Sequence, residues 1–271
     1  MNSFLRWAGS KRLILPKLAK YCPPSIKRYI EPFAGSARLF FALEPQCAVL
    51  GDLNEELIRT MRAIRRDVDL VLAAVRRLPL GKEEYYKIRK IDPRPLSDAE
   101  VAGRFIYLNR YCFNGLFRTN MQGHFNVPYA APKRGKLIPI AEPAIVEAAR
   151  LLKRAMLIHG DFETTLAHAR DGDFVYLDPP YAVERRRVFS EYLPGSFSRD
   201  DLARLSKCLE GLEERGAHFV ISYADSKEAR DLLRRWSPKR VHTPRNIAGF
   251  AADRRGAYEL IATNVPKEDR A

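Results

Sequence analysis

Short apolar runs recur along the chain, and several of them are separated by stretches long enough to hold a helix. Most runs are continuous rather than alternating, which is typical of strands that are covered on both faces, as in a parallel sheet. They predict strands at residues 28–33, 47–52, 155–161, 173–178, 217–223 and 258–264.

Helical periodicity follows some of these runs. Residues 54–78 place their apolar side chains on one broad stripe, which predicts a single long helix. Residues 198–216 begin with Ser198, a typical N-cap, and end at Gly216, a typical helix stop. This alternation predicts an α/β fold with a doubly wound, mostly parallel, Rossmann-like sheet.

The alternation breaks between about residues 60 and 155, where the chain is helical and then rich in loops. Asn114-Gly115 and Gln122-Gly123 are turn signals, and they predict a hairpin at about residues 113–129. We therefore expect residues 59–155 to form an inserted, mainly helical domain that carries a β-hairpin. Residues 1–58 and 156–271 then form the doubly wound domain.

The formal net charge of +14 favours a polyanionic partner. From Val101 to Ala141 the chain has no Asp or Glu, but it has cations, aromatic rings and asparagines. This combination favours nucleic acid over a membrane surface, although a solvated basic face with core aromatics remains an alternative. The residues are Arg104, Arg110, Arg118, Lys133, Arg134, Lys136, Tyr107, Tyr111, Phe113, Phe117, Phe125, Tyr129, Asn109, Asn114, Asn120 and Asn126.

Other features narrow the class of protein. No stretch approaches the roughly 18 apolar residues that span a bilayer, and the N-terminus lacks the apolar run of a secretory signal. We therefore expect a cytoplasmic protein with no membrane partner. The cysteines are far apart, and the five histidines show no metal-ligand spacing, so we expect free, buried thiols and no metal.

The stretch YIEPFAGSA, residues 29–37, reads as a strand, a glycine turn and a helix start, which can cradle a nucleotide-like ligand. Gly35 is the only glycine in this loop, so the dinucleotide pattern of a dehydrogenase is absent. Asp52 ends the next strand, where an acid can accept hydrogen bonds from ribose hydroxyls; its alternative role is a helix N-cap. Trp7 and Lys11, near the N-terminus, suit an amino-acid tail or belong to an exposed arm.

The stretch DPPY, residues 178–181, directly follows a predicted buried strand. An acid, two prolines and an aromatic residue at this position indicate a functional site, and the chemistry of the side chains suggests which kind. An exocyclic aromatic amine is a poor nucleophile, because its lone pair is delocalised into the ring. The carboxylate of Asp178 and the carbonyl of Pro179, held rigid by Pro180, can accept its two hydrogens and direct the lone pair at a methyl group. Tyr181 can stack on the base. The alternative is a rigid turn with a capping acid.

With these motifs in order, the chain resembles the Dam-type (class D12, alpha group) DNA adenine methyltransferases over nearly its whole length. The motifs are FLRWAGSK, EPFAGSA, DLN, YLNRYCFNGLFRTN with GHFNVPY, GDF, DPPY, RNIAG and ATN. The resemblance implies a prokaryotic or phage enzyme that transfers a methyl group from S-adenosylmethionine to the 6-amino group of adenine in double-stranded DNA. Residues 59–155 would then be the target recognition domain.

The resemblance also implies roles for individual residues. This chain departs from the usual family pattern at Phe113, where the family often has Tyr, and at Ala37, where it often has Gly. The polar stretch 182–198 is expected to close over a flipped base. Catalytic roles fall on Asp178, Pro179, Pro180 and Tyr181; cofactor contacts on Trp7, Lys11, Phe33, Gly35, Asp52, Asp161 and Asp178; and DNA contacts on Arg110, Phe113, Asn114, Leu116, Arg118, Asn126 and Arg245.

Three other functions remain alternatives at this point. They are a methyltransferase acting on a protein glutamine, an RNA adenine methyltransferase, and a DNA-binding protein that has lost catalysis. Hairpin similarity favours a target containing GAT, such as GATC. We further expect a monomer in solution and consider a cognate restriction endonuclease that shares the site.

Overall fold

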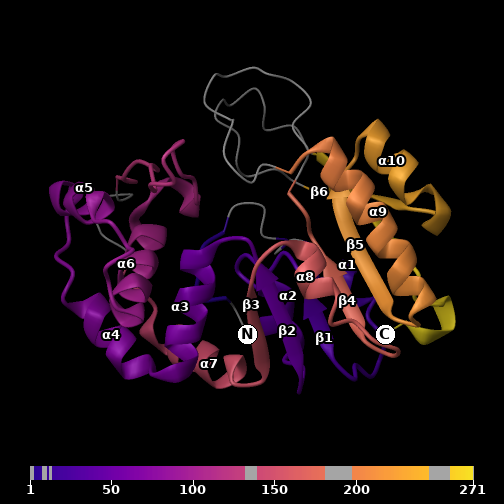
Figure 1. Ribbon diagram of the computed structural model, residues 1–271, viewed down its shortest axis with the longest axis horizontal. Helices are drawn as coiled ribbons and strands as arrows, with labels where there is room; N and C mark the ends of the chain where they lie inside the picture. The colour runs from indigo at the N-terminus through magenta and orange to yellow at the C-terminus, as the bar shows by residue number, and fades with distance from the viewer. Residues whose placement is uncertain are drawn as a thin grey trace.

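The computed structural model describes residues 3–7, 11, 14–131, 139–180, 197–243 and 257–270. Within these ranges the core is one seven-stranded sheet with the order β3-β2-β1-β4-β5-β7-β6 (Figure 1). The strands are β1 (Tyr29–Glu31), β2 (Ala48–Asp52), β3 (Ala155–His159), β4 (Phe174–Leu177), β5 (His218–Ala224), β6 (Lys239–Thr243) and β7 (Ala257–Thr263).

The sheet is mostly parallel, as the sequence predicts. Strands β1 to β5 run parallel to their neighbours, while β7 is antiparallel to both β5 and β6. All six predicted strands are present: β1, β2, β3 and β4 are shorter than predicted, while β5 and β7 keep the predicted length and are shifted by one residue. Strand β6 was not predicted, because the sequence KRVHT has the polar composition of an edge strand rather than a buried one.

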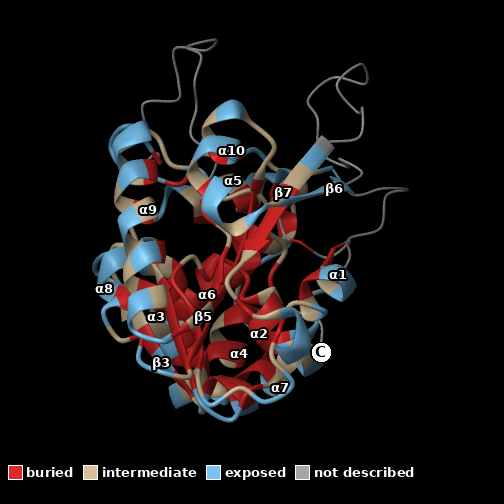
Figure 2. Ribbon diagram, turned by 90° about the vertical axis from the view of Figure 1, so that its right-hand side faces the viewer, coloured by how far each residue is buried: buried red, intermediate tan, exposed pale blue. Residues whose placement is uncertain are grey.

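Helices cover both faces of the sheet, since neighbouring strand residues point to opposite sides. Tyr29 packs with α1, α2, α3 and α7, and the next residue, Ile30, packs in a second cluster with α8, α9 and α10. Figure 2 shows helices on both sides of the buried strands. This confirms the doubly wound α/β fold. The bounds are α1 (Leu15–Ala19), α2 (Arg38–Leu43), α3 (Glu55–Arg66), α7 (Glu142–Leu152), α8 (Phe162–Leu166), α9 (Arg199–Glu214) and α10 (Lys227–Leu233).

The prediction of one helix over residues 54–78 is wrong. Asp67 has an extended backbone conformation and accepts a hydrogen bond from the backbone N–H of Leu70, so it ends α3 and caps α4 (Val68–Arg76). The apolar stripe continues through both helices, and periodicity alone did not reveal the break. By contrast, Ser198 caps α9 as predicted, and Gly216 follows its end with a φ of 72°.

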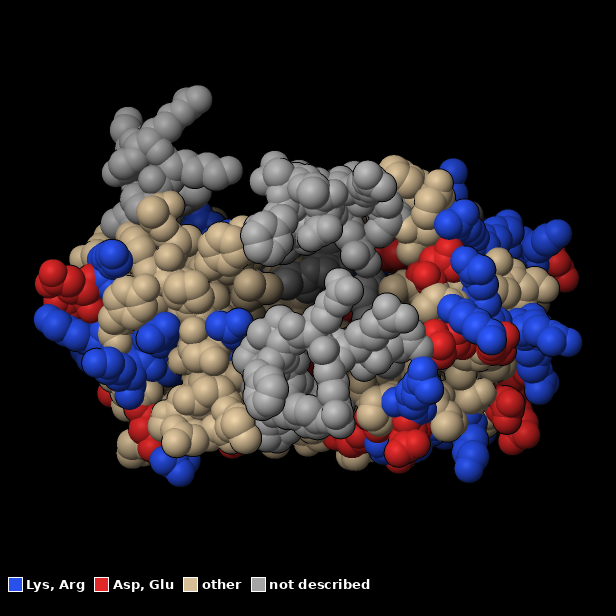
Figure 3. Space-filling model, turned by 90° about the horizontal axis from the view of Figure 1, so that it is seen from above, with Lys and Arg blue, Asp and Glu red and all other residues tan. Residues whose placement is uncertain are grey.

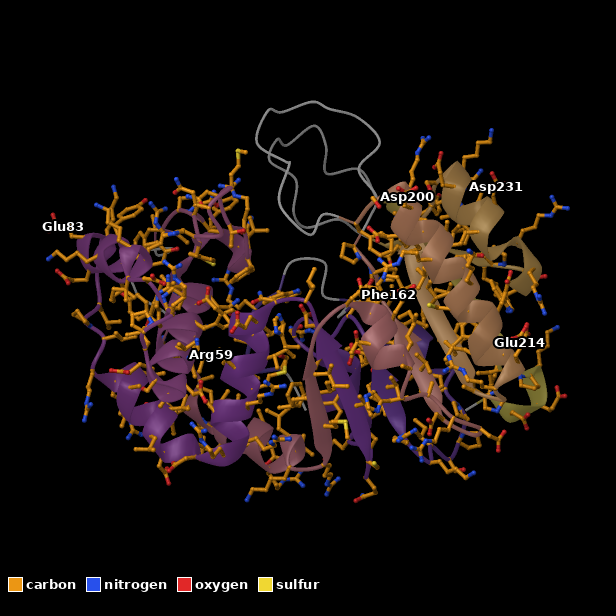
Figure 4. The ribbon with its side chains drawn as sticks, viewed as in Figure 1. Arg59, Glu83, Phe162, Asp200, Glu214 and Asp231 are labelled. Carbon is orange, nitrogen blue, oxygen red and sulfur yellow. The ribbon has the colours of Figure 1, made fainter. Side chains whose placement is uncertain are left out.

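The segment between β2 and β3 holds α3, α4, α5 (Lys82–Lys90), α6 (Asp98–Tyr111), the short helix η1 (Phe113–Gly115) and α7. Figure 1 shows α4, α5 and α6 beside the sheet, on the left. The expected domain boundary at residue 58 falls inside α3, which packs against the sheet and against α6. Arg59, labelled in Figure 4, joins these layers through Asp98 and the carbonyls of Pro93 and Leu96.

Several residues of the acid-free stretch are structural rather than exposed to a partner. Arg104 is buried, where it pairs with Glu56 and donates to the carbonyls of Ile88 and Arg89 at the end of α5. Tyr107, Tyr111 and Phe125 are also buried, in an apolar cluster beside the hairpin. The alternative of core aromatics is therefore correct for these rings, and Arg104 has no access to phosphates.

Two further expectations concern the chain as a whole. Among the described helices, none is long and apolar enough to cross a membrane. All four cysteines are free thiols, as expected, and Cys22 and Cys112 are buried. The expected burial is wrong for Cys47, which is exposed, and Cys208 is only partly buried.

Candidate active site

A cavity of about 390 Å³ opens at the carboxyl ends of β1 and β4, where the predicted cofactor loop and the DPPY motif meet. Its volume lies in the range that holds small-molecule ligands. It is lined by Trp7, Lys11, Leu15, Glu31, Phe33, Ala34, Gly35, Ser36, Arg38, Leu39, Tyr176, Asp178, Pro179 and Pro180. Seven of these residues were predicted from the sequence, whereas Asp52 and Asp161 lie outside this lining.

The loop after β1 is shaped by two residues with positive φ. Gly35 has a φ of +45°, and a Cβ atom placed there would lie 2.7 Å from Nε1 of Trp7. Ala37, where the family often has glycine, has a φ of 46° just before α2. A left-handed conformation costs an L-residue about 1–2 kcal/mol, and this chain forms the turn at Ala37 despite that cost.

Trp7 connects this loop with the hairpin. Its ring stacks on Phe105 of α6 and on Phe117, with centroid distances of 6.5 and 6.2 Å. The preceding residue, Arg6, exchanges backbone hydrogen bonds with the side chain of Asn109. The described N-terminal residues are therefore packed between the two parts of the molecule, which contradicts the alternative of an exposed arm.

Asp52 binds the loop after β1 and does not itself cap the helix that follows. Its Oδ2 accepts a hydrogen bond from the backbone N–H of Gly35, and its Oδ1 accepts one from Asn54, both at 2.8 Å. Asn54 caps α3 instead, by accepting from the backbone N–H of Leu57. Burial raises the pKa of the Asp52 carboxyl, while these N–H donors and the neighbouring His159 oppose the rise.

Asp178 lies at the end of β4 in a charged cluster. Its Oδ1 is 3.1 Å from the Nζ atom of Lys11 and accepts a 3.4 Å hydrogen bond from Ser222. The same Nζ atom is 3.2 Å from Glu259 of β7. Burial raises the pKa of Asp178 to about 6, and Lys11 limits the rise, so the carboxylate is the main form at neutral pH.

Two charged residues of the cavity were missed as site residues. Glu31 is 3% exposed, accepts a hydrogen bond from the hydroxyl of Tyr29, and has a pKa raised well above its usual value by burial. Arg38 is the first residue of α2 and lines the same cavity. The signal for both was present, since they stand within and directly after the motif EPFAGSA.

Asp161 lies at the end of β3, next to Asp52, because the N–H of Gly160 donates to the carbonyl of Asp52. Asp161 caps α8 and accepts a 2.8 Å hydrogen bond from Arg204 of α9. The Arg204 guanidinium lies over the ring of Phe162, which is labelled in Figure 4, and this ring is 5.4 Å from the ring of Phe33. This places Asp161 beside an aromatic pair at the edge of the cavity.

The segment after α6 folds back on itself. Isolated bridges join Cys112 to Tyr129 and Thr119 to Phe125, so the expected turn is present without two regular strands. Nε of Arg118 donates a 2.7 Å hydrogen bond to Oδ1 of Asn126 across the hairpin. The other predicted DNA contacts on this segment are Arg110, Phe113, Asn114 and Leu116, of which Phe113 is 47% exposed.

The charge on this face of the molecule is uneven. Figure 3 looks down on the face from above and shows Lys and Arg side chains gathered at both ends, over the region of α5 and over α9 and α10. Acidic side chains are interspersed among the cations at both ends.

Comparison with known proteins decides the family. The family model of D12 class N6 adenine-specific DNA methyltransferases matches residues 7–247. The chain belongs to this family. Membership implies S-adenosylmethionine as the methyl donor and DNA as the substrate, and it decides against the protein-glutamine and RNA alternatives.

Individual relatives match this chain over nearly their full lengths. The Type II methyltransferase M1.LlaDCHI of Lactococcus lactis subsp. cremoris is 32% identical, and the match covers 97% of this chain and 95% of the relative. The Type II methyltransferase M.MjaIII of Methanocaldococcus jannaschii is 33% identical, with 97% and 99% covered. The DNA adenine methylase of Escherichia coli strain K12 is 31% identical, with 98% and 96% covered.

Some expectations for this methyltransferase lie outside the described residues. They concern Tyr181 of the DPPY motif, Arg245 of the RNIAG motif and most of the stretch 182–198. Their roles remain predictions. Within the described ranges, no group of three or more His, Cys, Asp or Glu side chains is placed to hold a metal ion.

Proposed function

We propose that this enzyme methylates the 6-amino group of an adenine that is flipped out of duplex DNA, within a site containing GAT, such as GATC. One observation supports this most strongly. Asp178, Pro179 and Pro180 line the same cavity as Glu31, Gly35 and Arg38, so an amine acceptor and a cofactor-sized pocket adjoin. Methyl transfer requires that arrangement, because both reactants must meet in one place.

The residues present fit S-adenosylmethionine. Its amino-acid tail carries an ammonium and a carboxylate, and the cavity offers the buried Glu31 for the first and Arg38 for the second. Asp52 suits the ribose hydroxyls, and Phe33 with Asp161 suits the adenine ring and its edge. When bound, the cofactor supplies an electrophilic methyl group.

The protein's contribution to the reaction is to prepare the amine. An oxygen of Asp178 and the carbonyl of Pro179 accept the two amine hydrogens, which draws the nitrogen lone pair out of the ring. After transfer the nitrogen must lose one proton, and the carboxylate of Asp178 is the acceptor at hand. No covalent intermediate with the enzyme is needed. Tyr181 is the stacking partner for the extruded base in this proposal.

Target recognition falls to residues 59–155 in this proposal, with the hairpin at 113–129 reading the bases. Arg118 is exposed, and an arginine that reads guanine O6 and N7 is the commonest specific contact in the major groove. Asn114, Asn126, Leu116 and Phe113 supply amide contacts and apolar wedges, and Arg110 and Arg245 supply phosphate contacts. A monomer suffices, since each methyl transfer uses one such site.

A restriction endonuclease with the same target is a second part of the proposal. It is supported by the similarity to two proteins named Type II methyltransferases, M1.LlaDCHI and M.MjaIII.

The direct test uses purified protein, labelled S-adenosylmethionine and genomic DNA free of methylation. The DNA is digested to nucleosides and also sequenced for modified bases. We expect label in 6-methyladenine at one short motif containing GAT. Label at a motif without GAT would contradict the proposed target, and cofactor binding without any label would favour the inactive DNA-binding alternative.

A further inference from the structure

Strand β7, near the end of the chain, brings a second carboxylate to the catalytic cluster. Oε2 of Glu259 is 3.2 Å from Nζ of Lys11, and the same Nζ is 3.1 Å from Oδ1 of Asp178. The three side chains come from the N-terminal segment, the end of β4 and β7. Their side chains are 5%, 23% and 12% exposed for Lys11, Asp178 and Glu259.

The arrangement places one buried cation between two carboxylates. A buried ammonium needs charged partners to offset the cost of removing it from water. If Asp178 were its only carboxylate, Lys11 would compete with the substrate for both carboxylate oxygens. Glu259 holds the ammonium from the other side, so the Lys11 ammonium is shared between the carboxylates of Asp178 and Glu259.

The side-chain contacts of Asp178 within the described part of the chain fall on one of its two oxygens. Among the described side chains, Lys11 and Ser222 both approach Oδ1. Ser222 is fixed in turn by the hydroxyl of Tyr176, at 3.1 Å. Oδ2 is therefore the oxygen that the surrounding side chains leave for an incoming amine.

We infer that Glu259 is a positioning residue for methyl transfer, which holds Lys11 at Oδ1 of Asp178 and thereby keeps Oδ2 for the adenine amine. The inference rests on the amine-accepting role proposed for Asp178. Glu259 touches neither reactant in this assignment, and it acts through Lys11.

The charges that face Asp178 set the sign of a pH test. Lys11 lowers the pKa of Asp178, whereas Glu259 raises it, and burial is the largest influence and also raises it. Glu31 and Tyr176 are the other titratable groups of this cluster. Removing the charge of Glu259 therefore lowers the pKa of Asp178, and the acidic limb of the rate profile moves to lower pH.

The test compares Glu259→Gln with the unaltered enzyme in single-turnover methylation from pH 5 to pH 9. We expect about a tenfold loss of rate at neutral pH, an acidic limb at lower pH, and cofactor affinity within about threefold. Glu213→Gln is the matched control, because it removes a carboxylate paired with Arg235 away from the cavity. Glu259→Asp keeps the charge and should restore the acidic limb.

A double-mutant cycle separates positioning from general damage. In a Lys11→Met background, Glu259→Gln should change the rate by less than about twofold, because its route through Lys11 is gone. A wild-type rate and pH profile for Glu259→Gln, or full additivity with Lys11→Met, would overturn the inference. The coupling free energy between Lys11 and Glu259 is also measured by urea unfolding of the same variants, without substrate. This measurement does not depend on activity, so an unaltered enzyme that fails to methylate DNA would refute the proposed function separately.

Discussion

The backbone N–H of Gly35 donates a 2.8 Å hydrogen bond to Oδ2 of Asp52. This bond joins the loop after β1 to the end of β2, and it aligns the two elements proposed to hold the cofactor. Trp7 lies against the same glycine, so the loop is confined from both sides.

Gly35→Ala should weaken cofactor binding about tenfold. The new Cβ would lie 2.7 Å from Nε1 of Trp7, and the φ of +45° is unfavourable for alanine. Calorimetric titration with S-adenosylhomocysteine measures the effect. Gly123→Ala is the matched control, since Gly123 has a φ of +81° but open space around its Cβ position. If both variants bind equally well, contact with Trp7 does not matter.

The methylation rate should fall as the pH drops through about 6. The folded-state pKa of Asp178 is raised to about 6 by burial, and a protonated carboxyl cannot accept the amine hydrogen or its proton. The carboxylate is therefore available above this pH and lost below it, and kcat/KM should decline about tenfold per pH unit. Asp178→Asn should abolish turnover at every pH while leaving cofactor affinity within a few-fold. A pH-independent rate would remove the role given to Asp178.

Arg118→Ala should relax target choice at one base pair, with a loss of roughly 1–3 kcal/mol of discrimination. Asn126→Ala should have a smaller effect that is not additive with Arg118→Ala, because Asn126 holds the guanidinium through the 2.7 Å hydrogen bond. Methylation of a library of single-substituted sites measures both. Arg94→Ala removes an exposed cation paired with Asp92 and should leave target choice unchanged. The same site preference in all three variants would exclude base reading by this pair.

Arg38→Ala should weaken binding of S-adenosylhomocysteine but not of its carboxyl methyl ester. Arg38 lines the cavity beside the buried Glu31, where it can offset the carboxylate of the amino-acid tail. Ion pairs to a ligand in a partly buried site are stronger than surface pairs, so we expect about a tenfold change for the acid. Parallel titrations of the two ligands provide the measurement. An equal loss for both would mean that Arg38 only shapes the loop.

The residues that the sequence places correctly are those whose neighbours are local. Ser198 caps α9, and Gly35 turns the loop after β1, because each acts on the backbone next to it. The break at Asp67 was missed, since an apolar stripe can continue across two helices. Strand β6 was missed because it lies at a sheet edge, where pairing with β7 rather than burial defines it.

By itself the sequence determined the α/β class, six of the seven strands of the described sheet, the excess of positive charge and the motifs that identify the family. Only the tertiary structure decided which charges meet. Arg104 forms an ion pair with Glu56 in the core, and Asp52 accepts a hydrogen bond from Gly35. Glu259 of the last strand pairs with Lys11, which also pairs with Asp178. Residues far apart in the chain become partners through the packing of sheet and helices, and periodicity and local motifs carry no information about those distances.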